Sequence, residues 1–264
     1  MDGLLIDSEH IYTETINEIA AEHGLPPVPW ALRIKMQGRP GPAAAAVILP
    51  WLISQRHATS ADQQDLDQFL LQLTTEFPYM ESPESFFAET TRRQRAKWPG
   101  RTQFLPGALP LLERLSSNGT PIALATSTSK PNFKLKTGHL RTTESSKQFD
   151  LFPNHLVITG DDPRIPPGRG KPAPDIWLVA LDSLNAGRQD PIRPEECLVF
   201  EDGLIGVTAA KSAGMNFVWV PQDEVRKALG SETIEAQLLH EENALLSGQV
   251  LESLSDFDPE KYNL

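Results

Sequence analysis

Polar residues that could bind phosphate or a metal ion cluster at several places in the sequence. Glu201 and Asp202 directly follow the apolar run Leu198-Val199-Phe200. Paired carboxylates at the end of a buried strand suit a hard cation such as Mg²⁺. Asp202 could instead cap the helix that follows, and both interpretations stay open. A second acidic cluster, Asp2-Gly3-Leu4-Leu5-Ile6-Asp7-Ser8-Glu9, lies at the start of the sequence.

Two further clusters contain hydroxyls and a cation. The cluster Thr126-Ser127-Thr128-Ser129 follows an apolar run that ends at Ala125, and hydroxyls with backbone N–H groups at a strand end can hold phosphate oxygens. A helix N-cap before Pro131 is the plainer interpretation of the same residues. Lys171 lies in a loop rich in Gly and Pro before an expected helix, where it could neutralise a phosphoryl group or simply be a solvated lysine.

The elements that must position these residues change in type at about Pro106. Before that point the periodicity predicts helices only, beginning with one from Ser8 to His23. After it, amphipathic helices alternate with short apolar runs that predict strands at Ile122–Ala125, Leu156–Ile158, Leu198–Phe200 and Phe217–Val220. This alternation predicts a parallel sheet covered by helices, with ligands bound at the carboxyl ends of the strands.

Composition and charge exclude several classes of protein. The 264 residues carry a formal net charge of -11, which disfavours nucleic acid and anionic membranes as partners. No apolar run approaches the about 18 residues of a membrane span, and the N-terminal residues lack a signal-peptide pattern. The single cysteine, Cys197, begins an apolar run and is expected to be a small buried hydrophobe. We therefore expect a cytoplasmic monomer whose partner is a small molecule.

The order of the polar clusters resembles the haloacid dehalogenase-like hydrolase superfamily. Members of that superfamily have Asp-x-Asp-Gly at the end of a first strand, a Ser or Thr after a second strand, a Lys before a helix and an acidic pair after a later strand. The matching residues here are Asp2-Gly3, Thr126, Lys171 and Glu201-Asp202. Four motifs in register make the resemblance specific, and it covers nearly the whole chain.

Three phrases are similar to the pseudouridine-5'-phosphatase-like branch of this superfamily. They are Thr159–Pro163, Gly170–Ile176 and Leu254–Glu260. The resemblance implies a Rossmann-like α/β core with a parallel sheet, formed by residues 1–11 and 99–264, whose first strand is missing from this chain. It also implies a small helical cap domain formed by residues 12–98.

The resemblance also implies a reaction, a phosphate-ester substrate and a set of roles. Members transfer a phosphoryl group through an aspartyl-phosphate with the help of Mg²⁺. Asp2 would be the acid/base residue, with its backbone carbonyl on the metal. Thr126 would hydrogen-bond a phosphoryl oxygen and Lys171 would offset negative charge. Asp202 would bind Mg²⁺ with support from Glu201.

Substrate contacts are expected from the core and from the cap. In related enzymes a loop near the start of the cap reaches into the site, and Gly38 and Arg39 lie at the matching place. Arg39 could meet a polar or anionic group of the substrate, or be an ordinary surface arginine. Ser127 would join them from the core. The stretch 56–81 is longer than expected for the branch, and the sequence suggests no role for it.

One departure from the family pattern concerns the nucleophile. It is expected two positions before Asp2, and Met1 occupies the middle position of Asp-x-Asp. A central strand that buries about five apolar side chains contributes roughly 8–15 kcal/mol, against a total stability of about 5–15 kcal/mol. We therefore expect the chain as it stands to be marginally stable and inactive, and we favour a start codon assigned too late or a shortened chain.

Two alternatives to a phosphatase stay open at this point. A sugar phosphate mutase of the same fold would share every motif named above. A catalytically silent protein that binds a phosphorylated ligand or regulates a partner would also fit a chain without the nucleophile.

Overall fold

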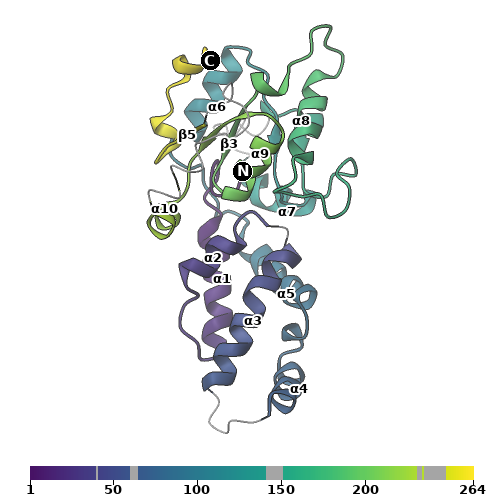
Figure 1. Cartoon of the computed structure of the whole chain (residues 1–264), viewed down its shortest axis with the longest axis vertical. Coiled ribbons are helices and arrows are strands. Elements are labelled where there is room, and N and C mark those ends of the chain that lie inside the picture. The colour runs from purple at the N-terminus through teal and green to yellow at the C-terminus, as the bar shows by residue number, and fades with distance from the viewer. Residues whose placement is uncertain (40, 60–64, 141–150, 231–233, 235–247) are drawn as a thin grey trace. The chain divides into compact units, whose positions relative to one another are not determined.

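The computed structural model divides into two compact units (Figure 1). It describes residues 1–39, 41–59, 65–140, 151–230, 234 and 248–264. The first unit comprises Met1–Ser8 and Pro99–Leu264, and the second comprises Glu9–Trp98.

The unit Glu9–Trp98 contains helices and no strand within its described residues. Its elements are α1 (Glu9–Glu22), α2 (Trp30–Met36), α3 (Gly41–Thr59), α4 (Leu66–Glu76), the 3₁₀ turn η1 (Pro78–Met80) and α5 (Pro83–Lys97). Ser82 accepts a hydrogen bond from the backbone N–H of Ser85 and thereby caps α5, which begins at Pro83. Apolar side chains of α1, α3, α4 and α5 form one buried cluster.

The other unit alternates strands and helices, as predicted. Its strands are β1 (Leu124–Ala125), β2 (Val157–Ile158), β3 (Leu198–Glu201), β4 (Asn216–Trp219) and β5 (Gly248–Val250). Its helices are α6 (Ala108–Ser117), α7 (Lys130–Thr137), α8 (Asp175–Asn185), α9 (Leu204–Ser212) and α10 (Asp223–Leu229), with 3₁₀ turns at η2 (Gly138–Leu140), η4 (Asn154–Leu156), η5 (Pro194–Glu196), η6 (Leu254–Asp256) and η7 (Pro259–Tyr262). The predicted α/β class with a small helical cap is therefore confirmed.

All strand pairs of the named sheets are parallel. In the described residues β1 pairs with β2, and β3, β4 and β5 form a second sheet in that order. β1 is shorter than expected because pairing with the two residues of β2 begins only at Leu124. β5 and α10 were not expected from the sequence.

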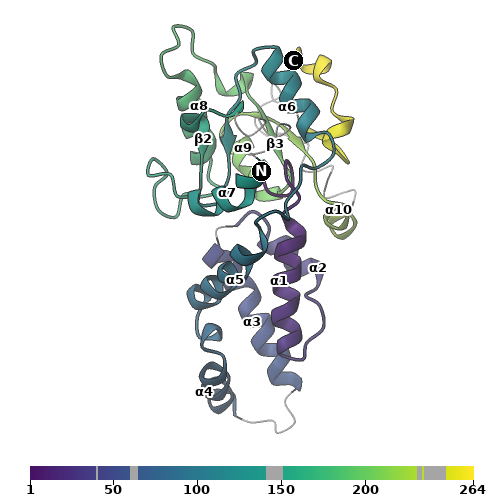
Figure 2. The same cartoon turned by 180° about the vertical axis from the view of Figure 1, so that it is seen from behind.

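Helices cover both faces of the second sheet. Phe217 and Trp219 of β4 belong to a buried cluster with α8 and α9, whereas Val218 belongs to a cluster with α6 and the C-terminal segment. Figure 2 shows α6 beside that yellow segment, as Figure 1 does from the other side. A strand buried on both faces must be apolar throughout, which explains the continuous run in β4.

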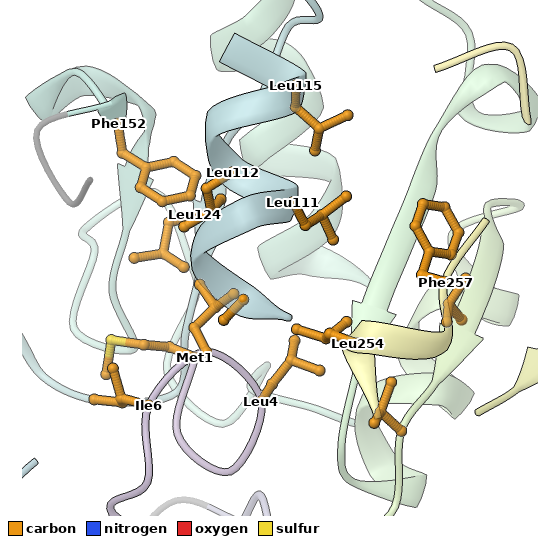
Figure 3. Close-up of a cluster of buried hydrophobic side chains, with 14 of the residues drawn as sticks. Met1, Leu4, Ile6, Leu111, Leu112, Leu115, Leu124, Phe152, Leu254 and Phe257 are labelled. Atoms are coloured by element: carbon orange, nitrogen blue, oxygen red, sulfur yellow. The ribbon is translucent and has the colours of Figure 1, made fainter. Parts of the chain in front are cut away.

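The N-terminal residues form a loop inside this core. Met1, Leu4 and Ile6 lie below Leu111 and Leu112 of α6 (Figure 3). A cavity of about 790 Å³ is lined by Met1, by both residues of β1 and by residues 198–200 of β3. The cavity therefore lies between the two sheets. Among the described residues, no helix is long and apolar enough to cross a membrane.

Candidate active site

Asp2 lies at the centre of a hydrogen-bonded network in the α/β unit. Its Oδ1 accepts from the Lys136 ammonium at 2.7 Å and from the Ser8 hydroxyl at 2.6 Å. Its Oδ2 accepts from the Thr128 hydroxyl at 2.8 Å. Lys136 also donates to Thr128 Oγ1 at 3.0 Å. Both carboxylate oxygens are thus held by donors from separate segments of the chain.

Lys136 comes from the last turn of α7, and its side chain is 1% exposed. α7 begins after Ser129 with Pro131 in its first turn, where the missing N–H of proline costs nothing. Thr102 donates its hydroxyl to the backbone carbonyl of Lys136 at 2.5 Å. An unpaired ammonium at this depth would cost several kcal/mol, so Lys136 depends on Asp2 as much as Asp2 depends on it.

The ionisation of Asp2 follows from these neighbours. Burial is the largest single influence and raises the pKa of Asp2, but the positive charges of Lys136 and of the Met1 α-amino group, together with hydrogen bonds, outweigh it, and the pKa falls to about 2. Hydrogen bonds from Lys136 and Ser8 act in the same direction. Asp2 is therefore a carboxylate at neutral pH, which is the form that accepts a proton.

A second buried pair joins Lys171 to Glu201. Their side chains are 7% and 8% exposed, and Lys171 Nζ lies 2.5 Å from Glu201 Oε1. The ammonium also lies 4.6 Å from the centre of the Trp177 ring, within cation–π distance. The Glu201 carboxylate packs against α9 at Gly206, where an added Cβ would lie 2.1 Å from Glu201 Cδ. Glycine at 206 is what leaves room for this carboxylate.

Asp202 follows β3 and is buried, with 8% exposure. It is not the residue that caps α9, because the N-cap is Gly203 and no side-chain cap bond is present there. The Trp219 indole N–H donates to the backbone carbonyl of Asp202 at 3.0 Å and fixes this end of β3. The N-cap position that the sequence offered to Asp202 is therefore occupied by Gly203.

Thr126 and Ser127 lie where β1 ends. Thr126 is buried, and its hydroxyl oxygen accepts from the backbone N–H of Thr128 at 3.2 Å, which leaves its own proton for another acceptor. The N-cap of the following helix is Ser129, the last residue of this hydroxyl cluster, and it makes no side-chain cap bond. Ser127 is half-buried, and its backbone packs closely against Gly160.

Four of the predicted core residues act electrostatically on the same group, the α-amino group of Met1. Burial lowers the pKa of this group, while the negative charges of Glu201, Asp2 and Asp202 raise it and Lys171 lowers it. Glu201 and Asp202 lie at the carboxyl end of β3, which is where a parallel sheet binds its ligands.

The proposed metal ligands do not form a complete ligand set. Within the described part of the chain, no group of three or more His, Cys, Asp or Glu side chains is placed to hold a metal ion. Asp2 is bound by Lys136, Ser8 and Thr128, and Glu201 is bound by Lys171. Asp202 remains compatible with Mg²⁺, which usually takes one or two carboxylates and keeps several waters.

Gly38 and Arg39 belong to the helical unit. Gly38 has a φ of 72°, and Arg39 is exposed and donates from its Nε to the Lys35 carbonyl at 2.6 Å. Within its unit, Arg39 thus packs back on the C-terminal turn of α2. Residues 60–64 of the long stretch 56–81 lie outside the described residues.

Sequence reasoning missed Lys136, Thr128 and Ser8 as partners of Asp2. Thr128 belongs to the hydroxyl cluster that follows Ala125, and Ser8 belongs to the acidic cluster at the start of the sequence, so their neighbourhood was the available signal. The sequence contains no comparable signal for Lys136, because a lysine on an amphipathic helix is normally solvated. It is separated from Asp2 by 134 positions, and only the folded chain brings them together.

The chain belongs to the haloacid dehalogenase-like hydrolases, since the family model of that description matches residues 1–214. It is 40% identical over 266 residues to a probable pseudouridine-5'-phosphatase of Saccharomyces cerevisiae, covering 100% of this chain and 94% of the relative. It is 34% identical over 264 residues to the mitochondrial (DL)-glycerol-3-phosphatase 1 of Arabidopsis thaliana, covering 100% of this chain and 72% of the relative.

Solved structures share the fold at lower identity. The structure of a family IA, variant 3 hydrolase from Entamoeba histolytica superposes with a TM-score of 0.63 at 20% identity, covering 99% of this chain and 94% of that one. CbbY from Rhodobacter sphaeroides in complex with phosphate superposes with a TM-score of 0.59 at 22% identity, covering 97% of this chain and 92% of that one. These likenesses support the architecture of the core and the cap.

Proposed function

We propose that the protein is a phosphatase that hydrolyses a phosphate monoester of a small metabolite through an aspartyl-phosphate. The observation that carries the proposal is the Asp2 carboxylate held on both oxygens by Thr128 and Lys136, with the buried Lys171–Glu201 pair at the end of β3 in the same unit. Membership of the hydrolase family supports the reaction class.

Asp2 is the residue assigned to proton transfer. In its ionised form it accepts a proton from the water that attacks the aspartyl-phosphate. To protonate the leaving oxygen of the substrate it must first gain a proton, and a bound phosphoryl group favours this because a nearby like charge raises the pKa of a carboxyl group. The same side chain then serves both half-reactions.

Thr126 and Lys171 are assigned to the phosphoryl group. The Thr126 hydroxyl keeps its proton for a phosphoryl oxygen. Lys171 has three N–H donors, of which one faces Glu201, so the ammonium can also bind an anion. Fixed donors and charges of this kind stabilise the negative charge of the transition state.

Magnesium is the proposed cofactor, with Asp202 as its carboxylate ligand and the Asp2 carbonyl beside it. When bound, Mg²⁺ would neutralise charge on the phosphoryl oxygens. Glu201 is better described as the partner of Lys171 than as a ligand, because its carboxylate is already paired. Asp202→Ala should therefore weaken magnesium dependence of turnover more than Glu201→Gln does. Equal magnesium dependence in Asp202→Ala and the parent would refute the assignment.

The nucleophile is proposed to be an aspartate two positions before Asp2, on a strand between β1 and β3. The cavity of about 790 Å³ between those strands supports this placement.

The test compares three proteins with a generic aryl phosphate and Mg²⁺. One is the 264-residue chain, the second carries an added apolar strand that ends in aspartate, and the third carries the same strand with alanine in place of that aspartate. We expect turnover from the second alone, because loss of a covalent nucleophile costs on the order of 10⁴-fold or more. Comparable turnover by the first and second proteins would show that the nucleophile is misassigned.

The names of the relatives suggest the class of substrate. Pseudouridine 5'-phosphate and glycerol 3-phosphate are both phosphate esters of a primary alcohol in a hydroxylated molecule, and this chain is similar to phosphatases named for each. We therefore expect such esters to be preferred over a hexose 1-phosphate. Release of inorganic phosphate from each compound measures the preference, and conversion of the hexose 1-phosphate to an isomer would point to a mutase instead.

A further inference from the structure

Lys136 is a buried charge that none of the predicted motifs contains. Its Nζ lies 2.7 Å from Asp2 Oδ1 and its side chain is 1% exposed. Lysine is almost never buried so completely unless it is paired. The pairing is with the residue assigned to proton transfer, so the position of Lys136 bears on the reaction.

Lys136 and Thr128 donate hydrogen bonds to different oxygens of the Asp2 carboxylate. Lys136 donates to Oδ1, while the Thr128 hydroxyl donates to Oδ2 at 2.8 Å and accepts from Lys136 at 3.0 Å. The three side chains form a closed triangle of hydrogen bonds. A carboxylate held on both oxygens cannot turn about its terminal bond without breaking one of them, so its plane is fixed.

We propose that Lys136 is a positioning residue for Asp2, which together with Thr128 fixes the plane of the carboxylate that transfers the proton. This inference rests on the proposed function, because it takes the role of Asp2 from there. General acid–base catalysis depends on the placement of the group before anything else. Lys136 therefore acts on the reaction through Asp2.

A purely structural role for Lys136 makes a different prediction. A variant that only folds less well has fewer active molecules, and its kcat/KM falls by the same factor for every substrate. A variant with a misplaced proton donor is slowed most where the leaving group needs the proton. The primary alkoxide of glycerol 3-phosphate needs it, whereas 4-nitrophenolate is a stable anion that leaves without it.

The experiment measures kcat/KM for glycerol 3-phosphate and 4-nitrophenyl phosphate in the protein that carries the aspartate-bearing strand. Lys136→Met keeps the length and apolar stem of the side chain and removes the charge. We expect kcat/KM to fall about 10–100-fold for the alkyl ester and less than about threefold for the aryl ester. The ratio of the two values is independent of the active fraction. Lys134→Met, at an exposed position of the same helix, is the matched control and should leave the ratio unchanged.

Further variants separate the possible outcomes. Thr128→Val removes the hydroxyl that binds Asp2 Oδ2 and should shift the ratio of the two kcat/KM values in the same direction. This variant therefore tests the positioning role if Lys136→Met does not fold. An unchanged ratio in Lys136→Met or, failing that, in Thr128→Val overturns the positioning role. If the protein that carries the aspartate-bearing strand has no turnover, or if its Asp2→Asn variant has undiminished turnover, the proposed function is overturned and the role of Lys136 with it.

Discussion

Cations are paired with carboxylates in both units, but the pairs differ in burial. In the α/β unit the side chains of Lys136 and Lys171 are 1% and 7% exposed. In the helical unit Lys97 is 17% exposed and lies 3.1 Å from Glu14 and 2.5 Å from Glu18, which are themselves 38% and 45% exposed. The first kind of pair must stay intact because its ammonium groups are buried away from water, whereas the second kind can exchange its partners for solvent.

The difference shows that the two kinds of pair serve different ends. A buried pair loses about as much hydration energy as it gains in attraction, so its net effect on stability is small even though breaking it is costly. Its value lies in orienting groups, as Lys136 orients Asp2. An exposed pair loses little hydration energy and does little to orient its groups. In the helical unit such pairs lie on the surface, while the helices pack through apolar side chains.

The largest effect on folding is expected when one buried partner is removed. Glu201→Ala leaves the Lys171 ammonium buried without its carboxylate and should lower the free energy of unfolding by about 3–5 kcal/mol. Glu201→Gln keeps an acceptor oxygen and should cost less. Urea denaturation followed by circular dichroism measures both, and a cost below about 1 kcal/mol for Glu201→Ala would place this pair with the exposed ones.

A smaller effect is expected from pH through Asp2. Its pKa is lowered from 3.8 to about 2, so the stability contributed by its charge is present above about pH 4 and is lost as pH falls toward 2. The shift corresponds to about 2–3 kcal/mol. Urea denaturation between pH 2 and 5 should show a weaker pH dependence in Asp2→Asn than in the parent, by about this amount. If the free energy of unfolding depended on pH equally in both proteins, the ion pair between Asp2 and Lys136 would not form in solution.

The smallest effect is expected in the helical unit. Lys97→Met removes the cation between Glu14 and Glu18 and should change the free energy of unfolding by no more than about 1 kcal/mol, with a smaller change in high salt. The same denaturation experiment at low and high salt measures it. A loss as large as that of Glu201→Ala would erase the distinction between the two kinds of pair.

The sequence predicted the fold well where burial dictates composition. The strand β4 is buried on both faces, so its residues Phe217 to Trp219 had to be apolar and were readable as a strand. β5 contains only Gly248, Gln249 and Val250, and pairing with β4 rather than its own composition makes it a strand. A partner far away in the chain leaves no local pattern to read.

The candidate site divides in the same way. Thr126 and Asp202 follow predicted strands and Lys171 precedes a predicted helix, so their positions made them candidates, whereas Asp2 became one through the resemblance of its motif to the family. Their pairing was not predictable: Glu201 could be placed beside Asp202 but not opposite Lys171, 30 positions away. Which cation meets which carboxylate is decided by the three-dimensional packing of α7, α8 and α9.

The close contact between Gly206 and Glu201 limits how this chain can change over generations. A side chain at 206 would need the space that the Glu201 carboxylate fills, since its Cβ would lie 2.1 Å from Glu201 Cδ. A larger residue at 206 therefore requires the Glu201 carboxylate to shift or residue 201 to shorten, and either change disturbs the contact with Lys171. Positions 171, 201 and 206 should consequently tend to vary together. In a library randomised at all three, folded proteins are expected to be enriched in matched triplets, with single replacements at 206 depleted.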